Sequence, residues 1–416
     1  MESPRASVED GILGIRFTTS GLMSTFGLPE PGGAAREHSA RVVEFLKAAI
    51  RHERGAIPFA RFMELALYAP GLGYYSAGAS KFGEAGDFIT SPELGNVFAE
   101  CVCEAVSPIL RGLPHPGFLE LGGGSGAFAV AFLQHAERLG VLPERYAILE
   151  PSADLRQRQQ QRLREALPPA VFARCDWLDG PPEGEWAGVL FANEVLDALP
   201  TTRFAIHEGE VYEEFVSLDA NGDFIRVDQP ADALVRAAVR HVERTLGAPL
   251  ADGYRSEVLP QLPYWVQAIG GLLKHGAMLF VDYGYPRREF YLPQRDDGTL
   301  VCHYRHRAHG DPFFLPGLQD ITAFVDFTAL AEAGTNAGFD FAGYCSQSSF
   351  LIANGLPQRI AEAEAVIDDR ERHRRINEIR KLTMPGEMGE RFQVMGFTRD
   401  VDLSAAFAFG ELSRRL

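Results

Sequence analysis

Short apolar runs alternate with amphipathic stretches over the central part of this 416-residue chain. The runs have the length of strands, and the stretches between them, such as 126–139 and 153–166, have the spacing of helices. This alternation predicts an α/β fold with a doubly wound, mostly parallel sheet. Strands are predicted at 117–121, 145–150, about 171–175, 187–192, 277–282 and 338–344.

Helices are predicted on both sides of this pattern. Within 38–66, a set of apolar residues falls at helical spacing, namely Val42, Phe45, Leu46 and Ile50, and Pro58 suits the first turn of a second helix. Further elements are expected at about 94–111 (an apolar helix), about 357–381 (a charged helix) and 391–398 (a late strand).

Residues 203–228 carry hairpin signals in place of strand–helix alternation. Glu208-Gly209-Glu210 lies between two strand-like runs, and Asn221-Gly222 repeats the turn signal. We therefore expect 203–260 to form an inserted α+β subdomain. The predicted order is a mobile leader (1–37), an N-terminal helical segment with lid loops (38–112), a Rossmann-like cofactor-binding core (113–202), the insertion (203–260), the rest of the core with a substrate loop (261–350), and a C-terminal helical extension with the late strand (351–416).

Charge and composition exclude several classes of protein. Acidic side chains outnumber basic ones by 56 to 40, giving a formal net charge of −16, which argues against nucleic acid as the main partner. The acidity suits a basic substrate, and it serves solubility alone equally well. Five cysteines without a CxxC motif argue against a disulfide framework and a thiolate zinc site.

The ends and the hydropathy of the chain bear on its compartment. No run of about 18 apolar residues is present, so no membrane insertion is expected. Glu2, Glu9 and Asp10 are unlike a signal peptide or a transit peptide. We expect a cytoplasmic protein if the chain is bacterial, and a mitochondrial matrix protein only if it is eukaryotic.

A glycine-rich turn follows the predicted strand 117–121. Gly122, Gly123, Gly124 and Gly126 allow a tight turn and close approach of a ligand, and the helix that follows offers free N–H groups. The spacing also satisfies a loose dinucleotide fingerprint. Glu120 just before the turn favours the cationic S-adenosylmethionine over a pyrophosphate, and a turn without any ligand is the remaining alternative.

Acidic side chains after the next strands suit the rest of such a nucleotide. Glu150 ends the strand 145–150 and could hold ribose hydroxyls in either ligand. Asp176 could bond an adenine amino group while Trp177 or Leu178 covers the ring. The alternative for this pair is a surface acid beside a core aromatic residue.

The predicted strand 187–192 is followed by candidate catalytic residues. Asn193, Glu194 and Asp197 should lie beyond its carboxyl end, where open α/β sheets bind ligands. Carboxylates bind guanidinium groups and favour loss of a proton from the attacking nitrogen. In the alternative interpretation, Glu194 or Asp197 caps the next helix.

Three histidines, His303, His306 and His309, recur at intervals of three. The spacing raises the possibility of a metal site, but Asp311 is the nearest supporting carboxylate. A loop lining the substrate is the preferred interpretation, and no metal is predicted.

These motifs together resemble the MidA-like family of methyltransferases. The matching segments are 67–75, 86–93, 119–126, 193–200, 282–284, 298–300, 316–322, 325–327 and 388–389 before Phe392. The resemblance implies a class I methyltransferase fold with an inserted subdomain and S-adenosylmethionine in the Glu120–Gly126 loop. The family loop usually has a proline where Gly123 stands here, which loosens the turn but preserves the other glycines.

The mitochondrial members of this family are arginine methyltransferases acting in respiratory complex I assembly. The resemblance therefore implies a protein substrate, such as a complex I subunit, and methylation of an arginine. The loop 86–93, with Gly86, Thr90 and Ser91 as cofactor-binding residues, and the segment 320–322 are expected to close over the site. The alternatives are a small-molecule methyltransferase, a nonenzymatic assembly factor and a nicotinamide-dependent oxidoreductase. The oligomeric state is not predicted.

Overall fold

The computed structural model describes residues 28–76 and 91–416, which form two compact units. The insert unit comprises the described part of Met1–Tyr74 with Pro200–Pro260 and Tyr291–Ile321. The core unit comprises the described part of Tyr75–Leu199 with Gln261–Phe290 and Thr322–Leu416. The predicted range 261–350 is thus shared between the two units.

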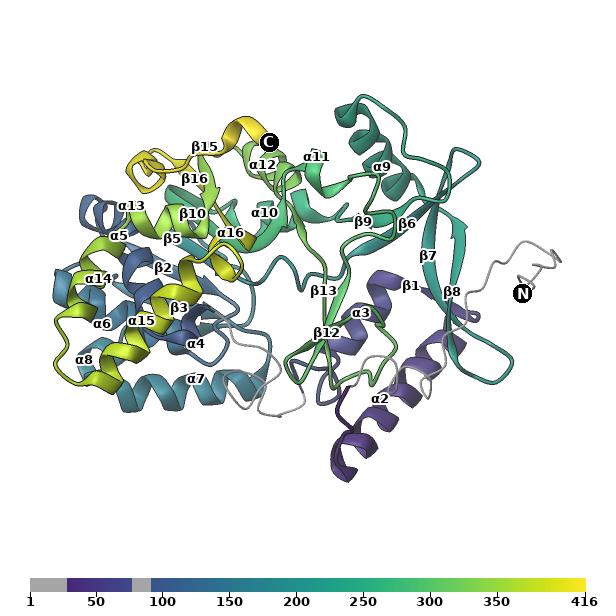
Figure 1. Ribbon diagram of the computed structural model, residues 1–416, viewed down its shortest axis with the longest axis horizontal. Helices are drawn as coiled ribbons and strands as arrows, with labels where there is room; N and C mark the ends of the chain where they lie inside the picture. The colour runs from purple at the N-terminus through teal and green to yellow at the C-terminus, as the bar shows by residue number, and fades with distance from the viewer. Residues whose placement is uncertain (1–27, 77–90) are drawn as a thin grey trace. The chain divides into compact units, whose positions relative to one another are not determined.

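The core unit is built on a sheet with the order β15-β16-β10-β5-β2-β3-β4, with β14 added beside β10. Figure 1 labels its strands β15, β16, β10, β5, β2 and β3. The strands β10, β5, β2, β3 and β4 run parallel, whereas β16 is antiparallel to both of its neighbours. The α/β class and the mostly parallel sheet are therefore confirmed. The strands are β2 (Gly117–Leu121), β3 (Arg145–Leu149), β4 (Cys175–Leu178), β5 (Trp186–Asn193), β10 (Leu273–Tyr285), β14 (Val325–Asp326), β15 (Asp340–Ser346) and β16 (Phe392–Arg399).

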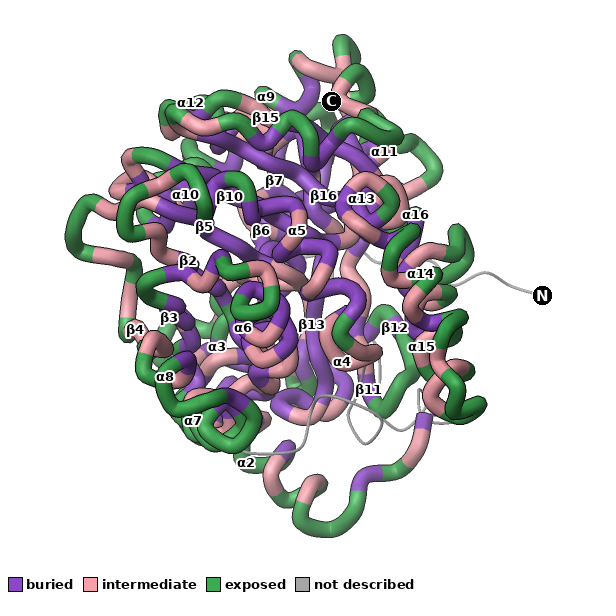
Figure 2. Tube along the Cα trace, turned by 90° about the vertical axis from the view of Figure 1, so that its left-hand side faces the viewer, coloured by how far each residue is buried: buried purple, intermediate pink, exposed green. Residues whose placement is uncertain are grey.

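Helices cover both faces of this sheet. On one face, α5 (Val97–Gly112) and α6 (Ala127–Leu139) pack Phe98 and Phe128 near Phe191 of β5, with ring centroids 6.4 and 4.4 Å away. Phe280 of β10 points to the opposite face, where Trp265 of α10 (Leu262–Gly270) lies 6.3 Å from it. The central strands are consequently buried along their length, as Figure 2 shows for β2, β5 and β10.

One predicted strand, 171–175, is wrong. Residues Pro169–Phe172 form a helical turn, α8, and the strand β4 begins only at Cys175. Pro168 and Pro169 explain the difference, because proline is favoured in the first turn of a helix and cannot donate in a central ladder. Asp176 and Trp177 consequently lie within a strand rather than after one.

The insert unit contains a five-stranded antiparallel sheet in the order β1-β7-β6-β9, with β8 beside β7. The predicted hairpin turns at Glu208–Glu210 and Asn221-Gly222 are confirmed, with Gly209 and Gly222 at φ of 78° and 81°. The strands are β1 (Ala56–Pro58), β6 (Thr202–His207), β7 (Glu210–Leu218), β8 (Phe224–Pro230) and β9 (Arg255–Val258). The helices of this unit are α2 (Gly33–His52), α3 (Phe59–Tyr68) and α9 (Ala233–Leu246).

The predicted ends of the chain need two corrections. Helix α2 begins at Gly33, inside the predicted leader, while residues 1–27 lie outside the described part of the chain. The charged stretch 357–381 is not one helix, because it divides into α14 (Leu356–Glu364) and α15 (Asp369–Thr383). The late strand is confirmed as β16, which completes the core sheet between β10 and β15.

The remaining elements are short or peripheral. They are α4 (Ser91–Leu94), α7 (Ala153–Ala166), α11 (Arg287–Phe290), α12 (Phe327–Asn336), α13 (Gln347–Ala353), α16 (Met388–Arg391), β11 (Val301–Tyr304), β12 (Arg307–His309), β13 (Asp320–Thr322) and two 3₁₀ turns, Ser404–Phe407 and Ser413–Arg415. Over the described ranges, no helix is both long enough and apolar enough to cross a bilayer.

Candidate active site and cofactor site

The glycine-rich turn between β2 and α6 adopts a backbone that glycine favours. Gly122, Gly124 and Gly126 have φ of 64°, 51° and 82°, in the left-handed region. A Cβ added at Gly124 would meet no atom within 4 Å, whereas one added at Gly123 would lie 2.8 Å from Cγ2 of Ile148. The turn therefore packs tightly on its inner side and is open at Gly124.

Glu120 lies at the base of this turn and is 3% exposed. Its Oε2 accepts a hydrogen bond of 2.7 Å from the hydroxyl of Tyr146 on β3. Burial raises the pKa of Glu120 to about 7, against the opposing effect of the Tyr146 hydrogen bond, and the charge of Glu150 raises it further. Glu120 is therefore a carboxyl group whose charge depends on what binds beside it.

Glu150 follows β3, in the place where the sequence predicts a ribose-binding acid. Its Oε1 accepts from the backbone N–H of Ser152 at 3.0 Å, and its Oε2 accepts from Nε2 of Gln159 at 3.2 Å. The group is buried and oriented before any ligand is considered.

Asp176 and Trp177 occupy neighbouring positions on β4 and differ in exposure. Asp176 forms an ion pair with Arg145 in which both side chains are about half exposed. Salt-bridging to Arg145 lowers the pKa of the Asp176 carboxyl. The indole Nε1 of Trp177 donates to Oε1 of Gln159 at 2.9 Å. Their predicted roles beside adenine stay predictions.

The loop expected to cover the site is described only from Ser91 onward. Gly86 and Thr90, two predicted cofactor-binding residues, lie outside the described part of the chain. The hydroxyl of Ser91 donates to Oε1 of Gln347 at 3.3 Å. Glu93, which the sequence analysis did not single out, instead accepts from the hydroxyl of Ser125 in the glycine turn.

The carboxyl end of β5 carries the predicted catalytic residues. Asn193 ends the strand, and its Nδ2 donates to Oε1 of Glu194 at 3.1 Å. Glu194 has φ of 54°, a conformation that destabilises a residue with a Cβ by roughly 1 kcal/mol and that recurs at functional sites. Its backbone N–H donates to Val281 at 2.9 Å, which fixes it beside β10.

Asp197 and Asp282 lie together at this edge of the sheet. Asp282, at the end of β10, accepts from the backbone N–H groups of Leu196 and Asp197 at 2.9 and 3.2 Å. The described chain from Glu194 to Thr201 contains no helix, so the interpretation of Glu194 or Asp197 as a helix cap is wrong. The chain turns here because Asp282 bonds its backbone.

Burial raises the pKa of both aspartates. For Asp282 the charges of Asp197 and Glu194 raise the pKa further. For Asp197 a hydrogen bond from Tyr283 acts in the opposite direction. In the described ranges no lysine or arginine forms an ion pair with either aspartate, so burial of these two acids is not balanced by a basic partner.

Asp282 and Gln159 are site residues that the sequence analysis missed. Asp282 was noted only within a matching motif, although an acid ending a buried parallel strand is itself a signal. Gln159 stands between Leu155 and Leu163 on the buried stripe of α7, where an apolar residue is expected. An amide at such a position was the available signal.

The three histidines belong to the insert unit. His303 lies on β11 and His309 on β12, and His306 is in the turn between them. Burial, then the neighbouring His303, lowers the pKa of His309 to about 4. Within the described residues, no group of three or more histidine, cysteine or acidic side chains is arranged to hold a metal ion.

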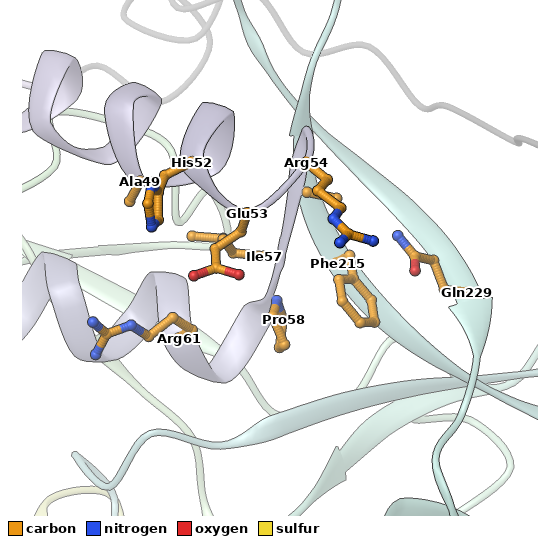
Figure 3. A pocket seen from close by; sticks show the side chains of 10 residues that line it. Ala49, His52, Glu53, Arg54, Ile57, Pro58, Arg61, Phe215 and Gln229 are labelled. Carbon is orange, nitrogen blue, oxygen red and sulfur yellow. The ribbon is translucent and has the colours of Figure 1, made fainter.

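The insert unit also has a pocket of about 700 Å³ (Figure 3). It lies between the end of α2, the start of α3 and the strands β7 and β8. Its lining combines basic, acidic and apolar side chains, among them Glu53, Arg54, Arg61 and Phe215. It shares no residue with the predicted cofactor or catalytic sets.

The core unit fits S-adenosylmethionine on three observations. Gly124 faces open space, so a ligand can approach its backbone. Oδ1 of Asn193 is buried and, among the described residues, has no hydrogen-bond partner, as expected of a group that awaits a ligand donor. The ordered carboxylate of Glu150 supplies acceptors for hydroxyl groups at the end of the adjacent strand.

Comparison with known proteins agrees with this geometry. Residues 99–345 match the family model described as a putative S-adenosyl-L-methionine-dependent methyltransferase. The chain belongs to this family. It is a methyltransferase that uses S-adenosylmethionine, and its core is the class I methyltransferase fold. The MidA-like resemblance is thereby confirmed.

Similar structures and relatives cover most of the chain. A likely methyl transferase from Burkholderia thailandensis, solved bound to S-adenosyl-homocysteine, is 41% identical with a TM-score of 0.86, covering 94% of this chain and 100% of that one. A mitochondrial protein arginine methyltransferase NDUFAF7 homolog from Caenorhabditis elegans is 27% identical, covering 88% of each chain. The human protein arginine methyltransferase NDUFAF7 is 26% identical, covering 81% of this chain and 79% of its own length.

Proposed function

We propose that this methyltransferase modifies an arginine side chain of a protein substrate. The observation that carries the proposal is the acidic edge at the ends of β5 and β10, formed by Glu194, Asp197 and Asp282. The names of the worm and human relatives, both protein arginine methyltransferases, support the same substrate class.

A guanidinium group suits this edge because its charge and its donors are complementary to carboxylates. Carboxylates bind guanidinium through paired N–H donors, and a buried acid without a basic partner is stabilised when a cation arrives. Asp197 and Asp282 are 6% and 1% exposed, so a cation beside them would interact in a poorly solvated site. Glu194 is held beside them by its backbone bond to β10.

In this proposal, one set of core-unit residues binds the cofactor and another orients the acceptor. Glu120, Glu150, Asp176, Trp177, Ser91 and the turn Gly122–Gly126 hold the cofactor, which supplies an electrophilic methyl group when bound. Asn193 contributes its buried amide oxygen to the same ligand. Asn193, Glu194 and Asp197 orient the acceptor, and a carboxylate takes the proton that the methylated nitrogen gives up.

The protein partner and the compartment are narrower predictions. The relatives named above are mitochondrial, which makes a respiratory complex I subunit a candidate substrate if this chain is eukaryotic. A bacterial chain would act in the cytoplasm on another protein. No contact of the described residues distinguishes these cases.

Glu194→Gln tests the catalytic part of the proposal. The purified enzyme is incubated with S-adenosylmethionine carrying a labelled methyl group and with an extract of cells lacking the gene, and methylarginine is quantified after hydrolysis. The variant should bind S-adenosylhomocysteine within about twofold of wild type but lose about 100-fold or more in transfer, because a positioned base contributes that much.

Glu208→Gln is the matched control. Glu208 is also a glutamate at positive φ (51°), but it is exposed in a hairpin turn of the insert unit. This variant should transfer methyl groups at the wild-type rate. Full activity of Glu194→Gln would remove Glu194 from the mechanism, and label found on lysine or on small molecules alone would overturn the arginine proposal.

A further inference from the structure

A buried glutamine of α7 connects three parts of the cofactor site. Gln159 is 0% exposed. Its Nε2 donates to the backbone oxygen of Gly124 at 2.9 Å and to Oε2 of Glu150 at 3.2 Å, and its Oε1 accepts from Nε1 of Trp177 at 2.9 Å. One amide thus reaches the glycine turn after β2, the acid after β3 and the indole on β4.

The chemistry of the three partners fixes the orientation of this amide. A backbone carbonyl and a carboxylate only accept hydrogen bonds, and an indole N–H only donates. The two N–H groups of Gln159 must therefore face Gly124 and Glu150, and its oxygen must face Trp177. Among the natural side chains of this length, only glutamine offers two donors and one acceptor in this arrangement.

The glycine turn is shaped to receive α7. A Cβ added at Gly126 would lie 2.9 Å from Cδ1 of Leu163 and 3.4 Å from Cα of Gln159. A Cβ added at Gly123 would lie 3.2 Å from Nε2 of Gln159. Two glycines of the turn consequently serve the close approach of this helix, and the amide bonds of Gln159 form within that contact.

We propose that Gln159 is a positioning residue that sets the geometry of the S-adenosylmethionine site through Gly124, Glu150 and Trp177. The inference rests on the proposed placement of the cofactor in this turn. A buried network of this kind rigidifies its members only when every polar group in it is satisfied. Loss of the amide removes one hydrogen bond each from the Gly124 carbonyl, the Glu150 carboxylate and the Trp177 indole, so ligand affinity falls more than any one bond would suggest.

Gln159→Leu removes the hydrogen bonds and keeps a side chain of similar size on a helix face that already carries leucines. We expect the dissociation constant for S-adenosylhomocysteine, measured by calorimetry on the full chain, to rise at least tenfold, with KM for S-adenosylmethionine raised in parallel. Gln160→Leu, on the exposed side of the same helix, should leave both constants unchanged.

Gln159→Glu separates positioning from packing. A protonated glutamic acid has one donor and one acceptor and resembles glutamine, whereas the ionised form has no donor and faces the Glu150 carboxylate. The affinity of this variant relative to wild type should therefore improve several-fold as the pH falls from about 8 to about 6, since burial beside an acid raises a glutamate pKa. Gln159→Leu should show no such dependence.

Trp177→Phe provides an internal check, because it keeps an aromatic side chain and loses the N–H donor. If the indole is held through Gln159, the losses of S-adenosylhomocysteine affinity caused by Gln159→Leu and Trp177→Phe should be less than additive in the double variant, and full additivity would contradict the coupling. Circular dichroism and thermal unfolding show whether each variant is folded. Should Gln159→Leu not fold, the pH dependence of Gln159→Glu decides.

The outcomes distinguish a failure of the role of Gln159 from a failure of the proposed cofactor placement. No binding of S-adenosylhomocysteine by the wild-type chain would contradict the placement of the cofactor. Wild-type binding together with unchanged affinity in Gln159→Leu, or a pH-independent affinity ratio for Gln159→Glu, would overturn the positioning role and leave Gln159 a purely structural residue.

Discussion

Each unit of the molecule buries a cluster of charged side chains, and the two clusters differ in charge balance. In the insert unit, Arg203 is 1% exposed and lies beside Glu214 and Glu257, which are 0% and 2% exposed. Arg255 joins the same cluster through Glu214 at 3.2 Å. Every buried acid named here therefore has an arginine partner.

The acidic edge of the core unit has the opposite character. Asp282 is held by backbone N–H groups, and Asp197 and Glu194 add to its charge. In the part of the chain that the structure describes, neither aspartate pairs with a basic side chain. Asp197 and Asp282 are as well buried as Glu214 and Glu257, but only the acids of the insert unit have arginine partners among the described residues.

The effect on titration follows from this difference. Burial alone would lower the pKa of Arg203, but Glu214 and Glu257 raise it above its ordinary value, so the arginine stays charged. Burial raises the pKa of Asp282, and its neighbours add to that rise. A balanced cluster stabilises a fold, whereas an all-acid cluster is available to a cation that arrives from outside.

Arg203→Met should have the largest effect on stability. It leaves Glu214 and Glu257 buried without their shared partner, and breaking a buried pair in this way costs about 3–5 kcal/mol. Urea unfolding, followed by circular dichroism, measures the loss. Arg51→Met, at an exposed position of α2, should change the unfolding free energy by less than about 0.5 kcal/mol. An equally small effect of Arg203→Met would show that the cluster contributes little.

Glu257→Gln should destabilise the insert unit by a smaller amount. Glu257 accepts from Arg203 and from both the backbone N–H and the hydroxyl of Thr299, at 2.8 and 3.1 Å. An amide must turn its NH₂ group toward one of these donors, which costs about 1–3 kcal/mol. Glu64→Gln, at an exposed position of α3, is the control in the same unfolding experiment. A rise in the unfolding free energy on Glu257→Gln would contradict the description of the Arg203 cluster as balanced in charge.

Asp282→Asn should act in the opposite direction and depend on pH. A raised folded pKa means that the stability contribution of Asp282 is present below the unfolded pKa of about 4 and is lost as the pH rises through the folded value. The variant should therefore gain unfolding free energy relative to wild type as the pH rises from about 4 to about 8, because only the wild-type carboxyl group has to ionise in this buried site.

The Asp282→Asn experiment has a matched control and an outcome that would contradict the prediction. The substituted amide can keep its oxygen toward the backbone N–H groups of Leu196 and Asp197. Its NH₂ group then faces the backbone N–H of Tyr283, which donates to Oδ1 of Asp282 at 2.9 Å, so a loss of stability that does not depend on pH accompanies the pH-dependent gain. Asp340→Asn, exposed on β15, should show no pH-dependent difference. A difference between wild type and Asp282→Asn that stays constant over this pH range would contradict the prediction.

The sequence predicted the elements whose pattern is local. The apolar runs of β2, β3, β5 and β10 and the glycine turn are continuous in the chain, and their fold follows from parallel strand order. The Arg203 cluster could not be predicted in this way, because its partners Glu257 and Asp297 lie 54 and 94 positions away. Register across the sheet, rather than spacing, brings such groups together.

In the candidate site, too, only the features that follow from the local sequence could be predicted. Glu120, Glu150, Asn193 and Glu194 follow from their positions at or just after the carboxyl ends of predicted strands, and the structure places them at the carboxyl ends of neighbouring parallel strands. The strand at 171–175 was misplaced because Val171 and Phe172 are apolar, while the true strand, Cys175–Leu178, carries a charged residue at its exposed edge.

The smallest effect on stability is expected for Asp176→Asn, because it tests an exposed ion pair against the buried ones. Asp176 and Arg145 are 50% and 57% exposed, so their ion pair is screened and contributes within about 0.5 kcal/mol.

The affinity for the cofactor is expected to respond differently from stability, because the Asp176 carboxylate accepts from Arg145 and from the backbone N–H of Trp177 and keeps further lone pairs. If one of these holds the adenine amino group, calorimetry should show S-adenosylhomocysteine affinity falling about tenfold while unfolding is unchanged. Unchanged affinity would make Asp176 a surface acid, and a large loss of stability would show that burial is not what separates the strong pairs from the weak ones.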